Sequence, residues 1–372
     1  MQPEDYKNRY IIIMAGGKGE RFWPVSRQAT PKQLITLLGN RSFLQQAADR
    51  VLPLAPVENI LVITNAVQAA AVRRQLPQLP PENVVGEPCG RDTCAAVTLG
   101  AALVAGRNPE GVMAVLPADH VIPDEAKFQQ IISDALDLAA QREVIVTIGI
   151  KPTEPATGYG YIHTGARIEL PADEFKTAFF QALRFVEKPS HDKAVEYLKS
   201  GEYRWNAGMF VWSCRTITAG LAAHQPEMAA ACERWRQTLK GGGLKRVLAR
   251  EYPGIKKISI DFALMEKAAN VVVADGTFTW DDLGAWTALA RHVKPDLQGN
   301  CAVADLVQVD SERNIIFDAR KKRRTPIALA GIRETVVVQT DDALLVASLD
   351  QAQKIKDLVA KLAADERYRH LV

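Results

Sequence analysis

Short apolar runs alternate with longer amphipathic stretches along residues 1–150. The run at 11–15, Ile-Ile-Ile-Met-Ala, is rich in β-branched residues and stops at a glycine, which is typical of a buried strand that enters a tight loop. The same alternation predicts strands at 59–64, 84–85, 112–116 and 144–150, and helices at 42–52, 67–76, 93–105 and 124–141. Strands that alternate with helices favour an α/β fold with a mainly parallel sheet covered on both faces. Such sheets bind ligands at the carboxyl ends of their strands.

The regular alternation of predicted strands and helices ends after residue 150, where the connections between them become longer. The pattern predicts strands at 157–162, 183–187 and 207–212, and helices at 191–200, 215–240, 261–268 and 284–293, which together indicate an α+β insertion built onto the same sheet. After Gly299, short β-runs follow at 301–309, 314–318, 327–330, 335–340 and 343–348, and a last helix at 350–363. We therefore expect one domain at 1–295 and a small β-rich C-terminal domain at 296–372 that ends in a helix.

Composition excludes several classes of protein. The 372 residues are 47% hydrophobic and 24% charged with a net charge of +3, which argues against a disordered chain and against a dedicated nucleic-acid binder. The basic run at 320–324 is expected to be a solvated hairpin turn. Five cysteines, an odd and scattered set, indicate reduced thiols. The absence of a signal-like N-terminus and of long apolar stretches predicts a cytoplasmic protein that does not contact a membrane.

A glycine-rich loop follows the first predicted strand. Residues 14–24 read MAGGKGERFWP, with three glycines within four positions, so the backbone can turn sharply and bring N–H groups close to a ligand. Lys18, Arg21 and Lys32 add cations that can neutralise phosphate oxygens. The spacing fits neither a Walker loop nor a dinucleotide fingerprint. From these residues alone, the loop is either a phosphate site or a plain tight turn.

This segment, together with Pro-Lys-Gln at 31–33, resembles the signature of the sugar-1-phosphate nucleotidyltransferases, and most of all the mannose-1-phosphate guanylyltransferases. The resemblance implies a Rossmann-like catalytic domain over 1–295 that forms GDP-mannose and pyrophosphate from GTP and mannose 1-phosphate with Mg²⁺. Glu20 departs from the family, since many members have Thr or Ser there.

The resemblance also assigns the nucleotide-binding residues. The segment 87–93, EPCGRDT, resembles the loop that contacts guanine, and a carboxylate at Glu87 can accept from both N1–H and N2–H₂ of guanine, a donor pair that adenine lacks. Asp92 or Thr93 can equally cap the next helix, and both roles can hold. The full nucleotide set implied is Ala15, Gly16, Gly17, Lys18, Gly19, Arg21, Lys32, Glu87, Arg91 and Pro117.

Two aspartates resemble the metal ligands of this family. Asp119, in LPADH, follows a predicted buried strand, where a hard oxygen ligand suits a Mg²⁺–nucleotide complex, although a lone Asp there can also act as a cap. In TWDDLGAW the motif places the second ligand on Asp282, with Asp281 the weaker candidate. His120 is expected to be structural rather than a base.

The sugar phosphate is assigned to a third group of residues. By resemblance, Glu187 in FVEKP accepts hydrogen bonds from sugar hydroxyls, and Lys188 holds the phosphate of the sugar. Asn206 in WNAGMF can donate and accept, and Gly158 lets the backbone approach the sugar ring. The segment 259–267 also matches the family, but helix capping explains its Ser and Asp, so it is left outside the predicted site.

The implied reaction is an in-line attack by a sugar 1-phosphate oxygen on the α-phosphorus of GTP. The nucleophile has a second pKa near ~6 and needs no strong base at neutral pH. Arg21 and Lys32 are expected to stabilise the triphosphate and the leaving group, Lys188 to position the attacking phosphate, and Mg²⁺ on Asp119 and Asp282 to bridge the substrates.

Three alternatives stay open at this stage. Another nucleotidyltransferase could use glucose 1-phosphate or a heptose phosphate with UTP, dTTP or GTP. A nucleotide–sugar sensor without turnover should lack a metal aspartate or the loop cations, and a nucleic-acid binder should have a clustered basic face.

The β-rich unit could mediate a homodimer. Some relatives carry a C-terminal phosphomannose isomerase domain, for which the residues after 295 are too few, so a single activity is expected.

Overall fold

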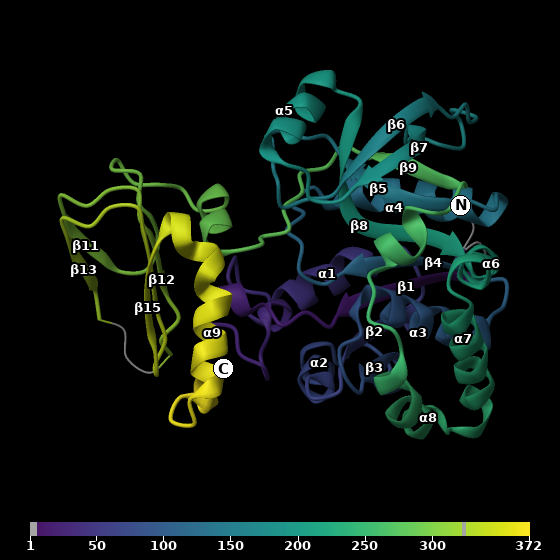
Figure 1. Ribbon diagram of the computed structural model, residues 1–372, viewed down its shortest axis with the longest axis horizontal. Helices are drawn as coiled ribbons and strands as arrows, with labels where there is room; N and C mark the ends of the chain where they lie inside the picture. Colours follow the sequence, from purple (N-terminus) through teal and green to yellow (C-terminus); the bar gives the residue numbers. More distant parts are fainter. Residues whose placement is uncertain (1–5, 322–324) are drawn as a thin grey trace. The chain divides into compact units, whose positions relative to one another are not determined.

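The computed structural model describes residues 6–321 and 325–372, which form two compact units (Figure 1). The first unit contains the residues up to 16, 47–118 and 122–281; the second contains 17–46, 119–121 and 282–372. The chain passes between the units several times, so each unit is built from three separate stretches of sequence. The division of the sequence at 295/296 stays a prediction.

Nine strands within the described residues form the sheet of the first unit, and the first four in order are parallel. The β5–β9 pair is also parallel, while the other pairs are antiparallel. The central strands are buried along nearly their whole length, as their β-branched sequences predict. Their order is β3 (Val84–Glu87), β2 (Ile60–Asn65), β1 (Arg9–Ala15), β4 (Val112–Pro117), β8 (Tyr203–Ser213), β5 (Ile145–Ile150), β9 (Val271–Gly276), β7 (Phe179–Val186) and β6 (Tyr161–Arg167).

Helix α3 (Asp92–Arg107) is the most deeply buried helix of those described in the first unit. It is rich in alanine and carries Gly100, where a Cβ would lie 2.5 Å from the Ile12 side chain of β1, so small residues allow the close approach of helix and sheet. Figure 1 shows α7 running beside α3, followed by α8. The remaining helices are α2 (Ala69–Gln75), α4 (Glu125–Gln141), α5 (His191–Ser200), α6 (Cys214–His224), α7 (Pro226–Thr238) and α8 (Leu244–Glu251).

The second unit contains two small sheets. Strands β10 (Cys301–Val303), β12 (Ile315–Asp318) and β14 (Thr335–Gln339) are parallel, and β15 (Leu344–Ser348) closes their sheet antiparallel. Strands β11 (Leu306–Val309) and β13 (Ile327–Ala330) pair in parallel in the other sheet. From β10 to β14, successive strands therefore alternate between the two sheets, and the strands within each sheet are parallel. The expectation of a small β-rich unit agrees with this, although the run at 301–309 is two strands, not one.

An aromatic cluster joins the glycine-loop segment to the C-terminal strands within this unit. The ring centroid of Trp286 lies 5.1 Å from that of Phe22 and 5.2 Å from that of Phe317. The indole of Trp286 donates to the carbonyl of Trp23, and that of Trp23 donates to the carbonyl of Leu371. Helix α9 (Ile355–Ala364) buries Ile355 and Val359 in the same core.

Several predicted helices differ from those observed. The stretch 215–240 is two helices, because Pro226 cannot continue α6 and instead begins α7. The stretch 261–268 is a π-helical turn at Asp261–Met265, and 284–293 contains only a 3₁₀ helix at Trp286–Arg291. The last helix starts as a 3₁₀ turn at Leu349–Lys354 before α9.

The remaining expectations concern surface and redox features. Part of the basic run, residues 322–324, lies outside the described residues; Arg320 forms a buried ion pair with Asp318 at 2.9 Å. All five cysteines are free, and four are buried. In the parts of the chain that the structure describes, no helix is both long and apolar enough to span a bilayer.

A buried carboxylate on α4 anchors the strand β7 to the rest of the first unit. Asp134 is 3% exposed, and its Oδ2 accepts from the backbone N–H of Lys176 at 3.0 Å and of Thr177 at 2.8 Å, and from the Thr177 hydroxyl at 2.6 Å. Its Oδ1 accepts from Gln130 at 2.8 Å. Both oxygens of the carboxylate are therefore used by the fold.

Asp134→Ala is expected to destabilise the protein by about 3 kcal/mol, because it removes a buried carboxylate that accepts four hydrogen bonds. The measurement is the urea unfolding transition followed by circular dichroism. Asp173→Ala, which removes an exposed carboxylate from the same loop, is the matched control and should change the transition little. Equal effects of the two variants would contradict the anchoring role.

Candidate functional site

The glycine loop and the Pro-Lys-Gln segment pack against each other in the second unit. Gly19 has a φ of 63°, and a Cβ there would lie 2.5 Å from the Cβ of Lys32 and 2.7 Å from its backbone nitrogen. Only glycine fits this position, because both the backbone conformation and the space exclude a side chain. Gln33 donates to the carbonyl of Gly17 at 3.1 Å, and the Ser26 hydroxyl donates to that of Gly19 at 2.7 Å. The two motifs thus form one structure.

A cavity of about 360 Å³ lies at this loop, within the second unit. Six of the predicted site residues line it, namely Lys18, Gly19, Arg21, Lys32, Asp119 and Asp282. The other lining residues are Glu20, Phe22, His120, Gly284 and Lys356. Among these lining residues, four basic side chains accompany three carboxylates. An anion with several charges, such as a polyphosphate, suits a cavity of this composition when a divalent cation accompanies it.

Lys32 is buried, whereas the other three basic residues that line the cavity are exposed. Its side chain is 6% exposed, and Nζ donates to Oδ2 of Asp119 at 2.9 Å and to the backbone carbonyl of Asp282. The ammonium also lies 5.7 Å from the ring centroid of Phe22 and 5.5 Å from that of Phe43. Lys18, by contrast, is largely exposed and only 3.6 Å from Glu20, so it can swing toward a ligand.

The electrostatics of the cavity keep Asp119 ionised. Burial by itself would raise the pKa of this carboxyl, but the positive charge of Lys32, the proximity of His120 and the hydrogen bond from Lys32 outweigh it. The pKa of Asp119 is therefore lower than its ordinary value. At neutral pH the cavity offers a carboxylate oxygen rather than a carboxylic acid.

The residues present fit a divalent metal that arrives with phosphates. Asp119 and Asp282 line the same cavity and are both partly exposed, whereas Asp281 is 6% exposed and belongs to the first unit. Within residues 6–321 and 325–372, no group of three or more His, Cys, Asp or Glu side chains is arranged to hold a metal. Mg²⁺ needs only one or two protein carboxylates when phosphate and water oxygens complete its shell. Asp119 and Asp282 are thus suited to that role.

The predicted guanine ligand lies in the first unit, at the end of β3. Glu87 is 6% exposed, and its Oε1 accepts a hydrogen bond from the hydroxyl of Tyr252. Its Oε2 would lie 3.0 Å from a Cβ on Gly16, so a glycine at the end of β1 leaves room for the carboxylate. Burial raises the pKa of Glu87 to about 7, although the bond from Tyr252 acts in the opposite direction.

Other predicted nucleotide residues have structural contacts in the same unit. Arg91 donates to the backbone carbonyls of Tyr252 and Pro253, and thereby holds that segment. The Asp92 carboxylate accepts from the N–H of Thr93 at 2.9 Å, but the N-cap of α3 is Arg91 and no side chain accepts a capping hydrogen bond there, so neither Asp92 nor Thr93 is the helix cap that the sequence suggested. The ends of β1 and β4, which include Ala15 and Pro117, are neighbours in the sheet.

The predicted sugar residues also gather in the first unit. Glu187 lies 3.2 Å from the ammonium of Lys188, which has a φ of 46° and a side chain that is 65% exposed. A Cβ on Gly160 would lie 2.7 Å from Oε2 of Glu187 and 3.5 Å from the Cβ of Asn206. Gly158, in contrast, has open space around it. Glu187 and Asn206 therefore both lie next to Gly160, on the side where a Cβ would project.

Three further residues were missed in the sequence. Asp261 accepts from the Asn206 amide at 2.7 Å, Tyr252 contacts Glu87, and Lys356 of α9 lines the cavity of the second unit. Helix capping, the role that the sequence suggests for Asp261, does not account for its carboxylate, which instead faces Asn206. No local pattern marks the other two, because their partners are distant in sequence.

The raised pKa of Glu87 makes stability depend on pH in a defined direction. The folded state binds this proton up to about pH 7 and the unfolded chain only to about 4.5, so stability is lost as pH rises between these values. Relative to Glu87→Gln, the wild type is expected to lose about 3 kcal/mol from pH 4.5 to 7.5. Urea unfolding of both proteins across this range is the measurement, and parallel curves would contradict the assignment.

Comparison with known proteins places the chain among enzymes. A family model described as "Nucleotidyl transferase" matches residues 10–299, and one described as "MannoseP isomerase/GMP-like beta-helix domain" matches 304–362. The chain is 39% identical over 360 residues to the xanthan biosynthesis protein XanB of Xanthomonas campestris pv. campestris (strain B100), covering 96% of this chain and 73% of that relative. It is 35% identical over 368 residues to mannose-1-phosphate guanylyltransferase of Escherichia coli (strain K12), covering 98% and 75%.

A solved structure agrees with these relatives. A crystal structure described as mannose-1-phosphate geranyltransferase from Thermus thermophilus matches with a TM-score of 0.82 and 34% identity, covering 95% of this chain and 99% of that one. The expected fold class, an α/β nucleotidyltransferase fold with a small β-rich C-terminal part, is thereby confirmed. By these matches over most of its length, the chain belongs to the nucleotidyl transferase family.

Proposed function

We propose that this protein transfers a guanylyl group from GTP to mannose 1-phosphate and releases pyrophosphate. The observation that carries the proposal is the cavity of the second unit, where Lys18, Arg21, Lys32, Asp119 and Asp282 come together as the motifs predict. The names of relatives that share 34–39% of the sequence, several of them mannose-1-phosphate guanylyltransferases, support the choice of substrates.

The cavity residues divide the phosphate chemistry between them. Nucleotidyltransferases generally use a divalent metal, for which we propose Mg²⁺ on Asp119 and Asp282; when bound, it lowers the charge of the phosphate groups. Arg21 and Lys18, both exposed, bind triphosphate oxygens, and Lys32 keeps Asp119 ionised and oriented. We add Lys356 to this set, since a fourth basic side chain stabilises the negative charge that develops on the leaving pyrophosphate.

In the first unit, other residues select the substrates. Glu87 accepts from the N1–H and N2–H₂ groups of guanine, Glu187 accepts from sugar hydroxyls, and the exposed ammonium of Lys188 holds the phosphate of the sugar. The Asn206 carbonyl already accepts from the N–H of Gly208 at 3.1 Å, so this side chain acts toward the sugar as a donor. A dianionic phosphate nucleophile needs no base, and no base is assigned. The expected homodimer and cytoplasmic location stay predictions.

A screen of nucleoside triphosphates against sugar 1-phosphates tests the function. Pyrophosphate release from GTP, UTP, dTTP and ATP, each with mannose 1-phosphate or glucose 1-phosphate, is followed with a coupled assay. We expect the highest kcat/KM for GTP with mannose 1-phosphate, and no release without a sugar phosphate. A higher value for another pair would assign the protein to a different nucleotidyltransferase reaction, and binding without release would favour a sensor.

Substitution of a proposed metal ligand tests the role of the cavity. Asp282→Asn is expected to lower kcat on the order of 100-fold at saturating Mg²⁺, because a metal ligand loses its negative charge and the metal is then held less well beside the reacting phosphates. Asp357→Asn, which changes an exposed carboxylate on α9, is the control and should keep normal turnover. Near-normal pyrophosphate release by Asp282→Asn would exclude this residue as a metal ligand.

A further inference from the structure

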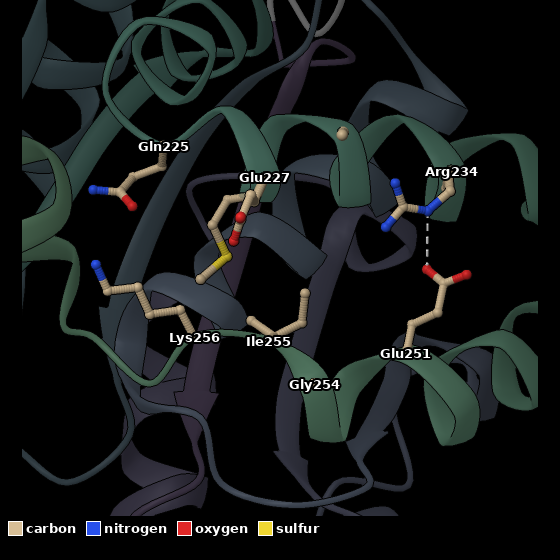
Figure 2. A pocket seen from close by; sticks show the side chains of 9 residues that line it. Gln225, Glu227, Arg234, Glu251, Gly254, Ile255 and Lys256 are labelled. Carbon is tan, nitrogen blue, oxygen red and sulfur yellow. Dashed lines mark hydrogen bonds and ion pairs between the residues drawn. The ribbon is translucent and has the colours of Figure 1, made fainter.

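One short stretch of the first unit contacts both groups of substrate residues. The residues from 252 to 261, here called the bridging segment, run from the 3₁₀ turn Tyr252–Gly254 to the π-helical turn that starts at Asp261. Figure 2 shows part of it, Gly254, Ile255 and Lys256, along a pocket of about 400 Å³ whose far wall includes Arg234. The function proposed above assigns no role to this segment.

At its first residue, the segment is fixed to the predicted base site. The Tyr252 hydroxyl donates to Glu87, and the Tyr252 side chain is fully buried, with its ring stacked on Trp235 at a centroid distance of 5.5 Å. Arg91 donates to the carbonyls of Tyr252 and Pro253. Burial and the charge of Glu87 raise the pKa of Tyr252, so its hydroxyl remains a donor. One oxygen of Glu87 is therefore held in place.

The middle of the segment is fixed to the first turn of α3. The carbonyl of Ile258 accepts from the N–H of Cys94 at 3.2 Å, and the N–H of Ile260 donates to the hydroxyl oxygen of Thr93 at 2.8 Å. Ile260 is fully buried. Since Thr93 directly follows the loop that begins with Glu87, these bonds limit movement of the segment relative to that loop.

At its last residue, the segment is fixed to the predicted sugar site. Oδ1 of Asp261 accepts from Nδ2 of Asn206 at 2.7 Å, while the amide oxygen of Asn206 accepts from the N–H of Gly208. A carboxylate can only accept and a backbone N–H can only donate, so the two partners together fix which way the amide faces. Because one N–H of the Asn206 amide donates to Asp261, the direction of the other N–H is fixed as well.

We propose that the bridging segment sets the positions of both recognition groups, with Tyr252 orienting Glu87 for the base and Asp261 orienting Asn206 for the sugar. Both are positioning residues, and the inference rests on the proposed function. Because Thr93 ties the middle of the segment, loss of its bond disturbs both recognition groups at once, whereas loss of either end disturbs only one substrate.

Tyr252→Phe tests the base end through discrimination between GTP and ITP, which lacks the 2-amino group. The variant is expected to raise KM for GTP about 10-fold and to reduce the preference for GTP over ITP, with KM for mannose 1-phosphate unchanged. Tyr10→Phe, which removes another buried hydroxyl of this unit, is the control and should leave the preference intact. The ratio does not depend on how much of a variant is folded.

Asp261→Ala tests the sugar end. It should raise KM for mannose 1-phosphate about 10-fold and leave the GTP:ITP preference unchanged, and Asp261→Asn, whose amide oxygen can still accept from Asn206, should restore most of the loss. Thr93→Val is expected to raise both KM values. If Asp261→Asn is as impaired as Asp261→Ala, or if Thr93→Val moves neither value, the positioning role is wrong.

The same assays separate this inference from the proposed function. If the wild type does not form GDP-mannose from GTP and mannose 1-phosphate, the proposed function fails. If the wild type does so while Tyr252→Phe and Asp261→Ala leave both KM values and the GTP:ITP preference unchanged, the function stands and the bridging segment has no positioning role.

Discussion

A single buried ammonium connects the three stretches of chain that form the cavity of the second unit. Lys32 comes from the stretch 17–46, Asp119 from 119–121 and Asp282 from 282–372, so one lysine bonds to each of the other two stretches of the second unit. A charge buried to 6% exposure must have partners, because an unpaired one costs roughly several kcal/mol. The need to satisfy Lys32 therefore also determines where the two aspartates lie.

The glycine loop depends on the same residue. Gly19 lies directly against the backbone of Lys32, where no side chain would fit, and the loop carries Lys18 and Arg21 into the same cavity. Lys32 also neutralises much of the charge on Asp119, which weakens the hold of the two carboxylates on a bare cation. A metal that brings its own phosphate ligands suits such a site better than a permanently bound ion, because the phosphates supply the missing negative charge.

The sequence was sufficient for the parts of the fold and site that depend on local pattern. Apolar runs predicted β1, β4 and the other strands, and the motifs predicted that Lys32 and Asp119 would share a site. It did not reveal Tyr252 as the partner of Glu87, since 165 positions separate them and pairing follows from packing of buried rings rather than from any local signal. In the sequence, Lys356 cannot be distinguished from other exposed helical lysines. It lines the cavity because α9 packs into the same apolar core as Phe22. The roles of the site residues toward substrates stay predictions.

In the proposed function, phosphate chemistry and substrate choice depend on different interactions. Cations and a metal stabilise any nucleoside triphosphate equally, so the cavity of the second unit cannot distinguish guanine from adenine. In the proposed function Glu87 does so, because it is buried: Tyr252 donates to one of its oxygens, and a base without two donors would leave the other oxygen without a hydrogen bond, which is more costly at a buried site than in water. Burial also favours the protonated acid, which accepts less well, and the hydrogen bond from Tyr252 opposes this by stabilising the carboxylate. Under this proposal, discrimination between bases depends on a balance between the burial of Glu87 and the hydrogen bond from Tyr252.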